Sequence, residues 1–104
     1  MPSIAQLEKL LAAEPDDPFL WYGLAQEHAK AGAGGVEKAL AAYDKCLSLD
    51  PLYCYGYFHK ARCLADAGRV GEAVVVVKAG LDAAKRAQDS HALSELSGLL
   101  DELT

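Results

Sequence analysis

Three histidines and three cysteines are the side chains of this chain best suited to metal binding or nucleophilic chemistry. His59 and Cys63 are four residues apart, which places both on one face of a helix, and Cys54 lies nearby in sequence. A structural zinc site needs four ligands, often in paired cysteine motifs, and this sequence has no such motif. We therefore expect no bound metal and no cofactor.

Catalytic patterns are also lacking in the sequence. No Ser-His-Asp or Cys-His arrangement can be argued from residue order. The stretch Gly32–Gly35 is rich in glycine but lacks the Lys-Ser/Thr ending of a phosphate-binding loop. We interpret His28 as a partly buried packing residue and His91 as a solvated residue at a helix start. The sequence thus predicts a protein that is not an enzyme.

Composition limits the remaining classes of function. A chain of 104 residues with 52% hydrophobic residues is suited to one domain with a modest core. The net charge is −5 and the basic residues are scattered, which argues against a nucleic-acid partner. No apolar run approaches the roughly 20 residues of a membrane span, and the N-terminus lacks a signal-peptide pattern. We expect a cytoplasmic protein with free thiols and no membrane contact.

The elements that would position any functional residue are revealed by an internal repeat. The stretch 7–15 aligns with 43–51, 36 residues downstream, and the same offset carries Trp21 to Tyr57 and Gly32 to Gly68. After the turn the offset falls to 34, since Ala39 aligns with Ala73. The first copy therefore has two extra residues, in the glycine-rich turn, where insertions cost little free energy.

This register resembles the tetratricopeptide repeat (TPR) family, whose repeats have a period of 34 residues. The positions that carry the family pattern in the first copy are Trp21, Leu24-Ala25, His28, Gly32, Ala39, Tyr43, Cys46 and Pro51. Those in the second copy are Tyr57, Lys60-Ala61, Leu64, Gly68, Ala73, Val77 and Gly80. Lys60, Val77 and the lack of a closing proline depart from the pattern, so the second copy is the weaker match.

The resemblance implies an all-α fold, a right-handed superhelix of antiparallel helical hairpins with about six helices in a single domain, 1–104. We expect a half-repeat helix at 3–14, full repeats at 18–51 and 52–87, and a capping helix at 90–103. Local signals agree: Ser3 and Gln6 have capping-box spacing, and Asp17-Pro18 has the form of a helix start. The valine run 74–77 favours a strand by propensity, but the repeat register predicts a helix.

The first helix of each full repeat has a second row of residues besides those expected to pack within the repeat. We define the first row as Phe19, Tyr22, Gln26 and Lys30, and the second row as Tyr55, Phe58, Arg62 and Asp66, each 36 residues further on. In TPR proteins these positions line the concave groove in which extended or helical peptides bind. The resemblance therefore implies a scaffold for protein–protein interaction whose protein or peptide partner the sequence does not identify. Aromatic residues and arginine are common at binding hot spots.

Two alternatives stay open. The rows could be covered by the chain's own last helix, through Leu93 or Leu96. The protein could also form a homodimer through its end helix or groove. Leu99, which lies off the predicted apolar stripe of Leu93, Leu96, Leu100 and Leu103, would assist such a contact. One TPR subclass is disfavoured: co-chaperone domains clamp a carboxyl terminus with lysines and asparagines, where this chain has Tyr22, Gln26 and His59.

Overall fold

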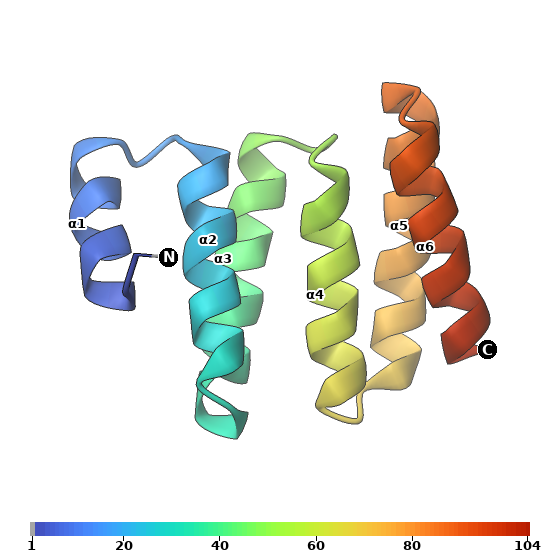
Figure 1. Ribbon diagram of the computed structural model, residues 1–104, viewed down its shortest axis with the longest axis horizontal. Helices are drawn as coiled ribbons and strands as arrows, with labels where there is room; N and C mark the ends of the chain where they lie inside the picture. The colour runs from blue at the N-terminus through green and yellow to red at the C-terminus, as the bar shows by residue number, and fades with distance from the viewer. Residues whose placement is uncertain (1) are drawn as a thin grey trace. The chain divides into compact units, whose positions relative to one another are not determined.

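The computed structural model describes residues 2–104, which form six α-helices, one 3₁₀ helix and no strand (Figure 1). The helices are α1 (Ile4–Ala13), α2 (Pro18–Lys30), α3 (Val36–Leu49), α4 (Cys54–Asp66), α5 (Val70–Ala87) and α6 (Ser90–Leu103). The predicted helices are confirmed, including the helix through the valine run. The short 3₁₀ helix η1 (Ala33–Gly35), in the glycine-rich turn, was not predicted.

The helix ends follow the polar residues that the sequence places there. Ser3 and Gln6 form the predicted capping box, with hydrogen bonds of 2.8 and 3.2 Å. Asp17 and Asp89 accept hydrogen bonds from the first turns of α2 and α6. These bonds satisfy backbone donors that a helix start otherwise leaves without a partner.

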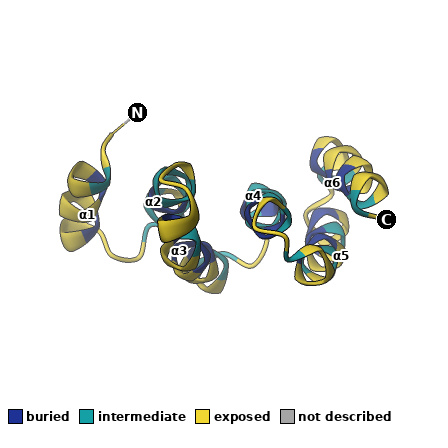
Figure 2. Cartoon of the chain, turned by 90° about the horizontal axis from the view of Figure 1, so that it is seen from below, coloured by how far each residue is buried: buried dark blue, intermediate teal, exposed yellow. Residues whose placement is uncertain are grey.

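The chain forms two compact units, one ending at Asp50 and one beginning at Pro51. In the first unit α2 contacts both α1 and α3, and α2 and α3 form an antiparallel hairpin. Its buried residues come from all three helices (Figure 2), and Tyr43, at 1% exposed, is the largest of them. The core residues of this unit are Leu7, Leu11, Leu24, Ala25, Ala39, Leu40, Ala42, Tyr43 and Cys46.

In the second unit α5 contacts α4 and α6, and α6 also contacts α4. Val77, Leu96 and Leu99 are its largest fully buried side chains. The expectation that Leu99 lies off the packing stripe and serves a homodimer contact is wrong, because this side chain is only 1% exposed. It packs inward because the buried face of α6 contains Ala92, Leu96 and Leu99.

The three cysteines are buried free thiols, as expected. Burial, with a smaller contribution from the nearby Asp50 carboxylate, raises the pKa of the Cys46 thiol to about 11. Cys46 is therefore protonated at neutral pH and behaves as a small apolar core residue. Within residues 2–104, none of the helices combines the length and the apolar character that crossing a bilayer requires.

Candidate binding faces on α2 and α4

The first row lies along α2 and presents a mixed aromatic and polar face. Phe19 is 63% exposed, an unusually open position for a phenylalanine. Its ring lies 6.4 Å from that of Tyr22, and Tyr22 in turn meets the buried Tyr43 ring edge-on at 6.4 Å. A chain of ring contacts thus leads from the core of the first unit to its surface, as edge-to-face aromatic packing favours.

Polar contacts hold the rest of the first row. The Gln26 Nε2 donates a hydrogen bond of 3.2 Å to the Tyr22 hydroxyl, which fixes the half-buried amide beside the ring. The Lys30 ammonium lies 3.0 Å from the Glu27 carboxylate, one helical turn away. Lys30 remains exposed, and such a surface pair holds it only weakly. The first row therefore offers apolar area at Phe19 and a hydrogen-bonding group at Gln26.

The second row lies along α4, and α6 runs beside it. The ring of Tyr55 lies 6.5 Å from His91 of α6, and the Arg62 guanidinium lies 3.1 Å from the Glu102 carboxylate. Arg62 also lies over the Phe58 ring, 5.9 Å from its centroid, which is cation–π geometry. Tyr55, Phe58 and Arg62 are each half-buried, whereas Asp66 is exposed.

The two rows, which repeat the same pattern in the sequence, thus differ in structure. Within the first unit, α2 contacts α1, α3 and η1, and Phe19 stays open. In the second unit the chain's own last helix contacts the second row, which was one of the two alternatives left open by the sequence. The recorded contacts come from His91 and Glu102, whereas the sequence suggested Leu93 or Leu96. Leu96 instead lies against Gly80 of α5.

Burial and neighbouring charges act on two groups of the second unit. Partial burial lowers the pKa of His59, and the Arg62 charge lowers it further, while the Glu95 carboxylate opposes the shift. Desolvation raises the pKa of Tyr55, and the carboxylates of Glu95 and Asp89 add to it. Both groups are therefore held in their neutral forms near pH 7, so the second row has its cationic charge on Arg62.

His59 and Cys63, which the sequence places at metal-binding spacing, both lie in packed surroundings. Among residues 2–104, no three His, Cys, Asp or Glu side chains come together as a metal site. His59 contacts the Phe58 ring edge-on at 5.2 Å, and Cys63 is buried. The helical spacing that suggested a metal site therefore corresponds to packing in this part of the chain.

Comparison with known proteins supports the repeat assignment. No family model matches the sequence. A tetratricopeptide repeat domain protein from Salinibacter ruber is 30% identical in its solution structure, which covers 86% of this chain and 88% of that one at a TM-score of 0.77. Its crystal structure is also 30% identical and covers 84% and 96% of the two chains at a TM-score of 0.73.

Two more distant likenesses agree with this fold. The translocator chaperone SycD of Yersinia enterocolitica is 18% identical, with 96% of this chain and 68% of that one covered at a TM-score of 0.80, and it shows the fold alone. Superkiller protein 3 of Saccharomyces cerevisiae is 29% identical over 76 residues. That match covers 73% of this chain but only 5% of the yeast protein. The predicted fold class, an all-α superhelix of TPR type, is confirmed.

Proposed function

Because this chain belongs to the tetratricopeptide repeat family, we propose that it is a non-catalytic interaction module that binds a protein or peptide through the first and second rows. The observation that carries the proposal is the open position of Phe19, which is 63% exposed and has its ring 6.4 Å from that of Tyr22. An exposed aromatic residue on a rigid helix gains contact area on binding at a low cost in conformational entropy.

The second row supports the same proposal in a different way. Arg62 forms an ion pair with Glu102. The Arg62 side chain is 39% exposed and that of Glu102 is 59% exposed, so water screens the attraction between their charges. A carboxylate from a partner can therefore replace Glu102 at little cost. We infer that the second row prefers an acidic group next to an apolar one, because Phe58 lies directly under the guanidinium.

The test is a selection of peptides from a random phage-displayed library on the immobilised full chain. Selected peptides are then synthesised, and their dissociation constants are measured by fluorescence anisotropy. Phe19→Ala should weaken binding by about five-fold or more, because truncating a hot-spot aromatic costs upwards of about 1 kcal/mol. Val75→Ala on α5 is the matched control, since Val75 is 68% exposed and lies outside both rows.

Equal affinity of the wild-type chain and Phe19→Ala for every selected peptide would contradict binding at the first row. Arg62→Ala tests the second row in the same assay, with far-UV circular dichroism to show that helicity is kept. Self-association is the alternative role, and sedimentation velocity over a range of concentrations tests it. The burial of Leu99 removes one leucine from the end-helix interface that this alternative would use.

A further inference from the structure

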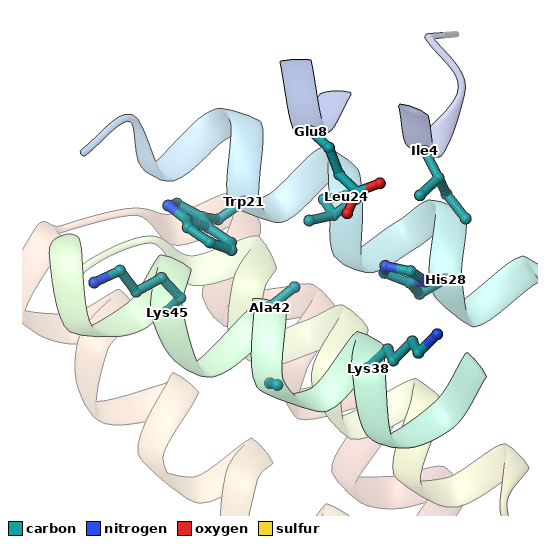
Figure 3. A pocket seen from close by; sticks show the side chains of 9 residues that line it. Ile4, Glu8, Trp21, Leu24, His28, Lys38, Ala42 and Lys45 are labelled. Atoms are coloured by element: carbon teal, nitrogen blue, oxygen red, sulfur yellow. The ribbon is translucent and has the colours of Figure 1, made fainter. Parts of the chain in front are cut away.

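A cleft on the first unit lies apart from the first row and takes no part in the function proposed above. Its volume is about 570 Å³, within the range of ligand sites. Among the described residues α1 and α3 both contact α2 but do not contact each other, so the cleft opens between them. Figure 3 shows Ile4 and Glu8 of α1 on one side and residues of α3 on the other, with α2 between them.

The floor of the cleft is apolar. Trp21 and Leu24 of α2 and Ala42 of α3 line it, and Ile4 of α1 closes one side. Leu24 and Ala42 are buried, whereas Trp21 and Ile4 are only half-buried, so apolar area remains in contact with water. A ligand that covers this area gains free energy from the hydrophobic effect.

The rim of the cleft is mainly basic. Lys38 and Lys45 line it from α3, and neither has an ion-pair partner among the described residues. Glu8 of α1 is the single acidic group in the lining. Lys38 and Lys45 are seven residues apart, which separates them by two helical turns, or about 10 Å along α3. Figure 3 shows Lys45 near Trp21 at one end and Lys38 near His28 at the other.

From this arrangement we propose that the cleft binds an amphipathic helix of a protein partner, with acidic residues at positions i and i+7 on either side of an apolar residue. The two acidic side chains pair with Lys38 and Lys45, and the apolar side chain covers Trp21 and Leu24. The spacing matches because a second α-helix laid alongside α3 repeats the same rise per residue. Insertion of an amphipathic helix between helices is a common mode of peptide recognition.

Trp21 provides a direct readout, because it is the only tryptophan of the chain and it lines the cleft. The probe is a crosslink-stabilised helical peptide without tryptophan, with glutamates at i and i+7 and one leucine between them on the same face. Its twin has lysines in place of both glutamates. The acidic peptide should shift Trp21 emission to shorter wavelength in a saturable way, whereas the lysine twin should not.

Charge reversal tests the rim. Lys38→Glu/Lys45→Glu should weaken binding of the acidic peptide about ten-fold or more, since two attractive pairs become repulsive. Lys78→Glu/Lys85→Glu is the matched control, because these lysines are also seven residues apart and exposed, but lie on α5 of the second unit. This control should bind like the wild-type chain. If the charge-reversed variant loses helicity, Lys38→Gln/Lys45→Gln replaces it.

A third variant tests the floor. Ala41 is exposed and lines the cleft, so Ala41→Phe fills the space without disturbing the core and should abolish the Trp21 response. The proposal is overturned if the acidic peptide gives no response up to about 1 mM, the weakest affinity that it allows. Equal binding by the lysine twin or by the Lys38→Glu/Lys45→Glu variant would also overturn it. Phe19→Ala should bind the acidic peptide as tightly as the wild-type chain does. A failure of the cleft proposal can therefore be told apart from a failure of binding at the first row.

Discussion

Trp21 and Tyr57 form the same contact in two successive repeats. The indole Nε1 of Trp21 donates a hydrogen bond of 2.7 Å to the carbonyl of Pro15, six residues earlier. The Tyr57 hydroxyl donates one of 2.8 Å to the carbonyl of Pro51, also six residues earlier. Each bond fastens the first helix of a repeat to the turn that precedes it. The 36-residue register is therefore present in specific hydrogen bonds as well as in the order of residues.

Removing the Tyr57 hydroxyl should have a measurable effect on stability. Tyr57→Phe keeps the ring and deletes the donor, so we expect a loss of about 0.5–1.5 kcal/mol in the free energy of unfolding. The loss in the free energy of unfolding should lie near the lower end of this range, because Pro51 is exposed and its carbonyl can accept a hydrogen bond from water instead. Urea denaturation measures it. Tyr55→Phe is the control, since its hydroxyl has no recorded hydrogen bond among the described residues, and it should change stability by less than about 0.5 kcal/mol.

Gly80 should tolerate no side chain. A Cβ at this position would lie 2.7 Å from the Cβ of Tyr57 and 3.1 Å from a methyl group of Leu96. We expect Gly80→Ala to lower the free energy of unfolding by about 1–3 kcal/mol, because α4 and α6 must move away from α5.

The control for Gly80 is Gly98→Ala in α6, where a Cβ would meet nothing within 4 Å. Alanine is the better helix former, so this variant should gain about 0.5–1 kcal/mol. Thermal unfolding followed by circular dichroism separates the two effects by sign. A stabilising Gly80→Ala would contradict the close approach of α4 and α6 to α5 at this glycine.

The ion pair between Arg62 and Glu102 should contribute little to stability. Both side chains are partly exposed, so Glu102→Gln should change the free energy of unfolding by less than about 1 kcal/mol. The same variant leaves Arg62 without its anionic partner. We therefore expect acidic peptides that bind the second row to bind Glu102→Gln more tightly, as isothermal titration calorimetry would show. Weaker binding would mean that Glu102 orders the site instead of competing for it.

Stability should fall as the pH drops from about 6.5, the usual pKa of histidine. The folded chain lowers the pKa of His59 through burial and the Arg62 charge, so the unfolded chain binds the proton more tightly. Protonation then favours unfolding, and the loss is complete below the folded-state pKa. Urea midpoints at pH 5 and 7.5 measure the difference. His59→Gln should reduce it, leaving the part that is due to carboxylates.

The sequence predicted the helices well because each depends on local signals repeated in register. Asp17 with Pro18, and Ser3 with Gln6, start helices through contacts within one turn, and the structure contains those contacts. The valine run was predicted correctly only because the repeat was recognised, since propensity alone favours a strand. Packing of α5 between α4 and α6 outweighs that preference.

Whether each row is open or is contacted by α6 could not be predicted from such local signals. Arg62 and Glu102 are 40 residues apart, and whether α6 brings them together depends on its angle across α4 and α5. The burial of Leu99 depends on how α6 is rotated about its own axis, since a rotation of about 100° would put Leu100 in its place at the packed face. The cleft beside Trp21 was missed because its lining residues come from three helices and share no sequence pattern.

Two adjacent glycines of the 3₁₀ turn between α2 and α3 have different amounts of room around them. A Cβ on Gly35 would overlap the carbonyl oxygen of His28, whereas one on Gly34 would meet nothing within 4 Å. Two adjacent glycines thus differ completely in tolerance. Gly34 is therefore the position in this turn where a fluorescent label or an affinity tag should be accepted while the repeat stays folded.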